Sequence, residues 1–299
     1  MRIVVALGGN ALLRRGDRPD AAVQRENAER VVTALAALAH DHELVITHGN
    51  GPQIGLLAVE SAADPALSTP YPLDVLGAGT QGMIGALLAR ALHNALPGRP
   101  VVTLVTHTVV RADDPAFAHP TKDVGRALAR HRGRRTGVDA TPPRRVVPSP
   151  SPRGIVEIAT VRELLDGGSL VICAGGGGVP VTVDQGTGAL TGVEAIVDKD
   201  LTAALLAEEL KADFLLVLTD VPCVYERFGT ADQKPLPDAG PARLRRARLP
   251  EDTMGPKAEA AARFVERTGG LAAIGALDAA YEIVHGRSGT LVRPDLDGG

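Results

Sequence analysis

Short apolar runs rich in β-branched residues recur along this chain and alternate with longer alanine- and leucine-rich stretches of helical period. This alternation predicts an α/β fold in which helices cover a parallel sheet. The clearest expected strands are 2–7, 43–47, 100–106, 169–174 and 214–219. The helices expected at 24–40 and 82–96 carry apolar residues at helical spacing, which assigns them to the core.

Four of the expected strands end in small or acidic residues. They are followed by Gly8-Gly9-Asn10, by His48-Gly49-Asn50-Gly51, by the glycines 175–178 and by Asp220. In open parallel sheets, ligands bind outside the carboxyl ends of the strands, where glycine lets backbone N–H groups approach an anion. Any one of these turns could be a plain strand-to-helix connection. Together, the four favour one shared crevice.

Composition excludes several classes of protein. The 299 residues can bury a large core, either as one large α/β unit or as about two domains. A net charge of -3 and 2% aromatic residues leave neither a basic face nor a stacking platform, so nucleic-acid binding is not expected. Cys173 and Cys223 lie in apolar runs typical of buried thiols, which fits a reducing cytoplasm. Neither a signal peptide nor a membrane span is indicated.

The first glycine turn lacks the lysine of a common phosphate loop, which ends in Gly-Lys-Ser/Thr. Lysine is rare here: only five of the 32 basic residues are lysines. Lys211, at a solvated helix end, and Lys234, in a polar run, fit random surface positions. The other three lysines occupy more informative places.

Two lysines stand where helices are expected to begin. Lys199 lies between Asp198 and Asp200, either of which can cap the helix that follows, and Lys257 follows Pro256, which suits the first helical position. A lysine there opposes the helix dipole by about 0.3–1 kcal/mol unless an anion is bound. The pair predicts two phosphate contacts, although water could screen either lysine alone.

The segment between residues 111 and 145 is polar and rich in Pro, Asp, His and Arg, and it includes Lys122. A segment this long is either a solvated loop or a small lid over the crevice. Both interpretations stay open from the sequence. As a lid, the segment would bring Lys122 to the site when it closes.

A series of motifs carries a closer likeness. In chain order they are VVALGGNALL, THGNGPQIGLLA, YPLDVLGAGTQGMIG, HPTK, RRVVPSP, VICAGGGGVPV, GVEAIVDKDL, LTDV and MGPKAEAAARFVE. The chain resembles the carbamate kinases, a branch of the amino acid kinase family, from Met1 to about Gly275. The resemblance implies a three-layer α/β sandwich, with a central mainly parallel sheet between helical layers and a small lid subdomain.

The resemblance also implies a domain division and an activity. Residues 1–112 and 146–190 would form the acceptor lobe, 113–145 a shortened protruding lid, and 191–299 the nucleotide-binding lobe. The activity would be the reversible, Mg²⁺-dependent conversion of carbamoyl phosphate and ADP into ATP and carbamate, within arginine metabolism. The partners would be these small molecules and a second copy of the chain, in a cytoplasmic homodimer.

Each implied site residue follows from its position in a matching motif. Lys199 and Lys257 would offset the charge of the transferring phosphoryl group, Asp200 would hold both lysines by ion pairing, and Lys122 would reach over the carbamoyl end. The phosphate would lie between Gly8, Gly9, Asn10, Gly49, Asn50 and Gly51. The nucleotide would be bordered by Gly175, Gly176, Gly177, Asp220, Tyr225, Met254 and Gly255, with Tyr225 near the base. Nucleotide phosphates and water would hold the Mg²⁺, so its protein ligands stay unknown.

The residues that are absent agree with this chemistry. Phosphoryl transfer between anionic oxygens needs positioning and charge stabilisation, without a covalent intermediate or a general base. The chain has no clear Ser-His-Asp arrangement, HExxH or CxxC. His48 and His107 are therefore interpreted as structural, with a ligand or base role as the alternative.

The departures from the family pattern cluster in the lid. The family continues Pro-Ile-Gly-Pro after the lid lysine, whereas this chain has Asp123-Val124-Gly125-Arg126 and a shortened approach to RRVVPSP. Asp252-Thr253-Met254 also replaces Gly-Ser-Met. These changes are either tolerated variation or the mark of a changed acceptor, such as another small acid or phosphate, or of weakened catalysis. A third hypothesis, a nucleotide-binding regulator without turnover, is disfavoured by the intact Lys199, Asp200 and Lys257.

Overall fold

The computed structural model describes residues 1–14, 16–124, 145–250 and 253–295. An eight-stranded sheet runs through it in the order β14-β16-β15-β11-β1-β2-β8-β3. Its strands are β1 (Arg2–Leu7), β2 (Glu43–His48), β3 (Val101–Thr103), β8 (Leu170–Ile172), β11 (Phe214–Thr219), β14 (Asp238–Ala239), β15 (Leu271–Ala276) and β16 (Thr290–Val292). All neighbours pair in parallel except β15 and β16. The predicted mainly parallel sheet is confirmed.

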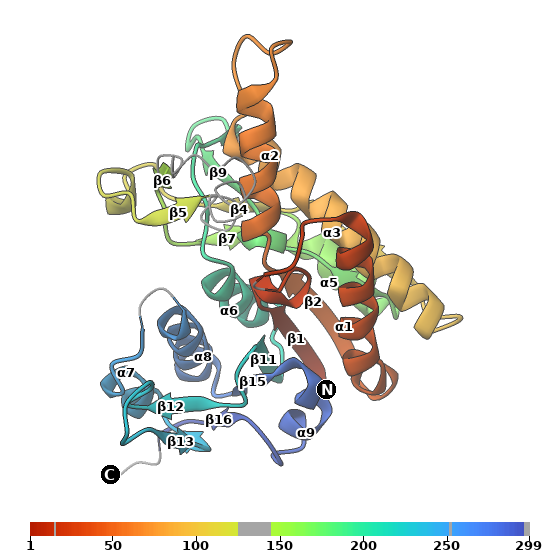
Figure 1. Ribbon diagram of the computed structural model, residues 1–299, viewed down its shortest axis with the longest axis vertical. Helices are drawn as coiled ribbons and strands as arrows, with labels where there is room; N and C mark the ends of the chain where they lie inside the picture. Colours follow the sequence, from red (N-terminus) through yellow and green to blue (C-terminus); the bar gives the residue numbers. More distant parts are fainter. Residues whose placement is uncertain (15, 125–144, 251–252, 296–299) are drawn as a thin grey trace.

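Helices lie on both sides of this sheet (Figure 1). They are α1 (Ala21–Asp41), α2 (Gly51–Ala63), α3 (Leu73–Ala95), α5 (Ile158–Asp166), α6 (Lys199–Glu209), α7 (Pro241–Arg246), α8 (Met254–Thr268) and α9 (Ala280–Val284). Alternate residues of β1 face opposite layers: Ile3, Val5 and Leu7 pack with α1, α3 and α9, and Val4 and Ala6 pack with α5, α6 and α8. Because both faces are buried, the strand reads as a continuous apolar run.

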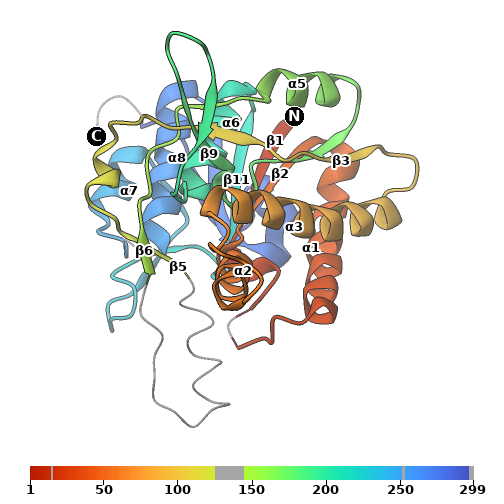
Figure 2. The same ribbon diagram turned by 90° about the horizontal axis from the view of Figure 1, so that it is seen from above.

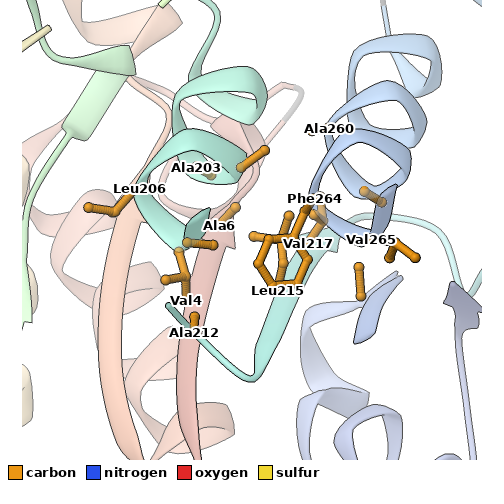
Figure 3. Close-up of a cluster of buried hydrophobic side chains, with 14 of the residues drawn as sticks. Val4, Ala6, Ala203, Leu206, Ala212, Leu215, Val217, Ala260, Phe264 and Val265 are labelled. Atoms are coloured by element: carbon orange, nitrogen blue, oxygen red, sulfur yellow. The ribbon is translucent and has the colours of Figure 1, made fainter. Parts of the chain in front are cut away.

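Helices α6 and α8 lie side by side over β1 and β11 (Figure 3). Their contacting faces carry small residues such as Ala203 and Ala260, which let the two helices approach closely, while Phe264 fills the space above the sheet. The helix α6 leads into β11 and α8 leads into β15, two parallel neighbours. The first residues of both helices therefore lie at the carboxyl edge of the sheet.

Several element boundaries differ from prediction. The expected strand 100–106 is too long, because β3 ends at Thr103 and the chain then enters a second sheet. In order, the strands of this sheet are β10 (Leu190–Gly192), β9 (Val179–Val183), β4 (His107–Val109) and β7 (Gly154–Ile155). The Thr106 hydroxyl accepts a hydrogen bond from the Ala174 backbone N–H at 2.8 Å, which fixes the break between the sheets. The helix expected at 82–96 begins at Leu73, and the strand expected at 169–174 covers only Leu170–Ile172.

Two short ribbons flank the main sheet. β5 (Lys122–Val124) pairs with β6 (Arg145–Val147) beside α2, and β12 (Val224–Glu226) pairs with β13 (Lys234–Leu236) (Figures 1 and 2). The first ribbon forms the base of the expected lid, most of which, at 125–144, lies outside the described residues. The predicted division into lobes remains a prediction, and the central sheet draws strands from both of them.

Within the described ranges, α3 is the one helix long and apolar enough to cross a membrane. Its Ile84, Leu88 and Leu92 are fully buried, and they pack in the layer that contains α1 and β1. This burial is typical of a core helix, and the apolar character of α3 follows from its place in the layer.

Candidate active site

Two glycine turns meet at the carboxyl edge of the sheet. Gly8 follows β1 and donates its backbone N–H to Leu218 O at 3.0 Å, and Gly49 follows β2 and donates to Leu7 O at 3.0 Å. A Cβ on Gly49 would lie 2.7 Å from the Cα of Gly9, so these backbones touch without room for a side chain. No atom lies within 4 Å of a Cβ placed on Gly9 or Gly51, so space remains beside the turns.

A cavity of about 1020 Å³ opens over these turns. It extends from the base of the lid, across the first residues of α6, to the start of α8 and the β12–β13 ribbon. The predicted site residues that line it are Gly8, Gly9, Asn10, Gly49, Asn50, Gly51, Lys122, Gly176, Lys199, Asp200, Asp220, Tyr225, Met254 and Lys257. The turns, the lysines and four of the residues expected beside the nucleotide (Gly176, Asp220, Tyr225 and Met254) therefore line one cavity.

A buried cluster of two lysines and one aspartate forms the polar centre of this cavity. Asp200 accepts from Lys199 Nζ at 2.7 Å through Oδ1 and from Lys257 Nζ at 3.0 Å through Oδ2. The Asp200 side chain is only 5% exposed, and the two lysine side chains are 18% and 12% exposed. The ion pairing expected of Asp200 is present in the structure.

The local sequence explains how the cluster forms. Asp198 caps α6, because its side chain accepts from the backbone N–H groups of Asp200 and Leu201. The helix α8 begins at Met254, so Pro256 is its third residue rather than its first, a correction to the expected boundary. Proline is tolerated there because the first four N–H groups of a helix have no partner within the helix. Lys199 and Lys257 both occupy a first helical turn.

Burial and charge act in opposite directions on the three ionisable groups. Burial would raise the pKa of Asp200, but the adjacent ammonium groups lower it to about 2. Burial and the neighbouring Lys199 lower the pKa of Lys257 to about 8. Burial also opposes the charge on Lys199, but Asp200 and Asp198 outweigh it and raise the pKa of this lysine. One carboxylate thus serves two ammonium groups, which leaves the cluster with excess positive charge for an anion.

Lys122 reaches the same region from the base of the lid. Its Nζ lies 2.8 Å from Asp198 Oδ2, beside the cap of α6. The strand that carries it is held by Val124, which is buried with Val147 of β6 and with Ile54 of α2. The neighbouring Asp123 also lines the cavity. Asp252, which was expected to place a carboxylate near a phosphate-binding turn, lies outside the described residues.

The opposite end of the cavity is more apolar. Tyr225 and Phe228 line it with their ring centroids 6.1 Å apart, and Met254 lies on the same wall. Asp220 accepts from the side-chain amide of Asn10 at 3.1 Å, which ties the β11 turn to the β1 turn.

Some expected nucleotide contacts lie behind the cavity wall. Gly176 lines the cavity, but Gly175 and Gly177 do not. The Cα of Gly175 packs against the His48 ring, and Gly177 packs against the Val197 carbonyl. Gly255 is also outside the lining, and its backbone N–H donates to Pro250 O at 2.8 Å. The nucleotide contacts expected of these glycines stay predictions.

The histidines and cysteines take positions that fit structural roles. His48 is fully buried, which lowers its pKa to about 4, and its Nδ1 lies 3.2 Å from Gly49 O. His107 lies away from the cavity and pairs with Glu157 at 2.6 Å. Cys173 and Cys223 are buried as expected, and burial raises the pKa of the Cys173 thiol to about 12. Cys223 also lines the cavity.

Sequence reasoning missed several lining residues. Phe228 and the ion pair between Arg30 and Asp278, with N and O atoms 3.3 Å apart, were not singled out. Arg14, four residues after the first glycine turn, also lines the cavity. Phe228 could have been noticed because aromatic residues are rare in this chain and this one lies three residues after Tyr225. Nothing in the local sequence pairs Arg30 with Asp278.

Known proteins resemble the chain along nearly its whole length. The model of the amino acid kinase family matches residues 1–274. A carbamate kinase of Rhizobium meliloti is 45% identical over 302 residues, covering 98% of this chain and 93% of that protein. A carbamate kinase of Escherichia coli K12 is 45% identical over 298 residues, covering 97% and 98%. The structure of carbamate kinase from Giardia lamblia bound to AMP-PNP superposes with a TM-score of 0.90 at 34% identity, covering 98% of each chain. The chain therefore belongs to the amino acid kinase family and, within that family, to the carbamate kinases.

Proposed function

We propose that the protein transfers a phosphoryl group reversibly between carbamoyl phosphate and ADP, giving carbamate and ATP. Its full-length relatives make it a carbamate kinase and an ATP-using enzyme. The observation in this chain that carries the proposal is the buried Lys199–Asp200–Lys257 cluster, which opens into the cavity above the two glycine turns.

The reaction needs charge stabilisation more than proton transfer. A terminal phosphate oxygen of ADP attacks the phosphorus of carbamoyl phosphate, and the bond from phosphorus to the carbamoyl oxygen breaks. The electron pair of that bond stays on the departing carbamate, which is an anion and needs no proton. Lys199 and Lys257 would stabilise the negative charge on the oxygens of the transferring group, while Asp200 holds both ammonium groups in place.

The glycine turns would bind the phosphate through the backbone. Gly8, Gly9 and Asn10 come from one turn and Gly49, Asn50 and Gly51 from the other, and all six line the cavity. The open space beside Gly9 and Gly51 leaves room for a phosphate where side chains would otherwise stand. Gly51 begins α2, so the positive end of that helix faces the same space.

The aromatic end of the cavity suits a nucleotide base. Tyr225 and Phe228 would stack against it, and Met254 and Asp220 would border the rest of the nucleotide. Lys122 would reach over the carbamoyl end from the lid. This arrangement agrees with an acceptor lobe formed by residues 1–112 and 146–190, a lid at 113–145 and a nucleotide lobe at 191–299.

The residues present fit a magnesium ion that arrives with the nucleotide. No group of three or more His, Cys, Asp or Glu side chains among the described residues could hold a metal. Asp198 and Asp200 are already paired with lysines, whereas Asp220 lines the cavity and, in the part of the chain that the structure describes, has the neutral hydrogen-bond partners Asn10 and Thr219. A bound Mg²⁺ would neutralise phosphate charge, with oxygen ligands supplied mainly by the nucleotide and water.

The enzyme is further proposed to act as a cytoplasmic homodimer. The resemblance to the family supports this assembly, and Val75 and Met83 of α3 expose 48% and 44% of their area. Light scattering on the protein as it elutes from a size-exclusion column measures the mass of the assembly. The mass of a single chain at micromolar concentration would contradict the homodimer.

The decisive experiment follows ATP formation from carbamoyl phosphate and Mg-ADP by the purified protein. Lys257→Ala should lower kcat/KM by about 10²- to 10³-fold, on the scale of one lost electrostatic contact to the transferring group. Lys211→Ala, which removes an exposed lysine outside the cavity, serves as the matched control. A folded, nucleotide-binding protein that makes no ATP would refute the proposal and redirect the search to other small acids.

A further inference from the structure

The carboxylate of Asp198 divides its two oxygens between different parts of the molecule. Oδ1 accepts from the backbone N–H groups of Asp200 at 2.9 Å and Leu201 at 3.2 Å, which caps α6. Oδ2 lies 2.8 Å from Lys122 Nζ, at the base of the lid. The Asp198 side chain is 13% exposed, so the carboxylate end of this contact is largely buried. One residue thus joins the helix that begins with Lys199 to the strand that begins with Lys122.

The backbone beneath Lys122 is fixed, but its side chain depends on this contact. Val124 and Val147 anchor the β5–β6 ribbon in a buried cluster against α2 and α3. The Lys122 side chain, by contrast, is 40% exposed and has a long, flexible stem. Asp198 is its hydrogen-bond and ion-pair partner within the described ranges. A lysine ammonium has three N–H donors, so two stay available for a ligand.

We propose that Asp198 is a positioning residue that holds the Lys122 ammonium at the carbamoyl end of the site and couples the β5–β6 ribbon to the transfer centre. The inference rests on the proposed function, which gives Lys122 a contact with carbamoyl phosphate. Without Asp198, binding of the substrate would have to order a free lysine side chain, and this ordering opposes binding. With Asp198, the ammonium already points into the cavity when the substrate arrives.

An opposite role for the same contact gives a result of opposite sign. If Asp198 occupied the place of the substrate anion on Lys122, removal of its charge would free the lysine and lower KM for carbamoyl phosphate. Two N–H donors of Lys122 have no partner among the described residues, which favours positioning, because the substrate can bind without displacing Asp198.

Asp198→Asn separates the two tasks of the side chain. Asparagine caps helices about as well as aspartate, so α6 keeps its first turn, while the charge that holds Lys122 is lost. We expect KM for carbamoyl phosphate to rise about tenfold, on the scale of the rotamer freedom of one lysine side chain, with KM for ADP and the melting temperature nearly unchanged. Asp184→Asn is the matched control, since the Asp184 carboxylate accepts from the backbone N–H groups of Gly186 and Thr187 and lies outside both the cavity and the lid.

A double-variant cycle with Lys122→Ala supplies the readout that a purely structural role would not change. Lys122→Ala should raise KM for carbamoyl phosphate in the parent, but it should add less than about twofold in the Asp198→Asn background. Fully additive effects, an unchanged or lowered KM in Asp198→Asn, or a Lys122→Ala variant with parental kinetics would each overturn the inference. If Asp198→Asn does not fold, Asp198→Ser keeps a capping hydroxyl and replaces it in the cycle. Failure of the parent to form ATP would instead refute the proposed function.

Discussion

Replacement of Asp200 by asparagine tests the electrostatic design of the site. The substitution keeps the size and shape of the side chain but removes the one negative charge that Lys199 and Lys257 share, at 2.7 and 3.0 Å. Because all three side chains are largely buried, water cannot replace that charge effectively. Two ammonium groups are then left facing each other.

The size of the effect follows from the distances. A carboxylate and an ammonium about 4 Å apart attract by about 4 kcal/mol at an effective dielectric constant of about 20, and the substitution removes this attraction. One pKa unit corresponds to about 1.4 kcal/mol, so the loss of the attraction lowers a lysine pKa by about three units. In the parent the pKa of Lys257 is about 8, so Lys257 is the lysine that loses its proton in the variant. Asp200→Asn should therefore leave a single cation in the site at neutral pH.

The pH profile of kcat/KM measures this change, because it reports ionisations of the free enzyme. In the parent, kcat/KM should fall as pH rises through about 8, where Lys257 loses its charge. In Asp200→Asn, the same fall should begin about three pH units lower, and the loss at pH 8 should be about 10²- to 10³-fold. Ionisation of the substrates affects both proteins equally, so it cancels in the ratio of the kcat/KM values of Asp200→Asn and the parent.

Asp166→Asn is the control, because Asp166 pairs with Arg2 at a site 64% exposed and outside the cavity. This variant should keep the parental profile. The reasoning is refuted if Asp200→Asn keeps the parental alkaline limb, or if it loses less than about tenfold in kcat/KM at pH 8.

Three further predictions use other parts of the structure. Gly49→Ala places a Cβ 2.7 Å from the backbone of Gly9 and should lower the free energy of unfolding by about 1–3 kcal/mol. The control, Gly51→Ala, places its Cβ in open space. Equal melting temperatures for the two variants would contradict this prediction. The pKa of Asp200 is lowered to about 2, so its stabilisation is complete above the ordinary value near 4 and disappears as pH falls toward 2. Between pH 5 and pH 2, the free energy of unfolding measured in urea should therefore fall by about 2 kcal/mol more for the parent than for Asp200→Asn. If the two proteins lose stability in parallel, Asp200 does not contribute this pH-dependent stabilisation. Chelation by EDTA should abolish ATP formation and excess Mg²⁺ should restore it; unchanged activity in EDTA would count against a nucleotide-borne metal.

The central sheet was predictable where local sequence and tertiary environment agree. Buried parallel strands are apolar on both faces, so the continuous runs at Arg2–Leu7 and Phe214–Thr219 indicated them with correct bounds. The run from 100 to 106 also consists mostly of apolar and β-branched residues, but its last residues connect two sheets. The start of α3 at Leu73 was also missed, because Gly77 and Gly79 are typical of loops, and burial of Leu73 and Leu76 outweighs that local preference.

The candidate site was predictable in part because its residues lie at the ends of predictable elements. Lys199 and Lys257 stood out as lysines that oppose a helix dipole, and the structure brings them onto one carboxylate. The contact between Lys122 and Asp198 could not be predicted, because 76 residues separate the two positions. Their meeting depends on how the β5–β6 ribbon packs against α2, which no local pattern encodes.

The strand order also bears on how the chain folds during synthesis. The strand β1 lies between β2, which follows it closely, and β11, which leaves the ribosome about 200 residues later, or roughly 10 to 40 s at usual translation rates. During this interval the backbone N–H and C=O groups along one side of β1 have no native strand to pair with, next to apolar side chains. The nascent chain thus exposes an unpaired, apolar strand edge until β11 is synthesised. The first strand is therefore the place where a chaperone would protect this enzyme from aggregation.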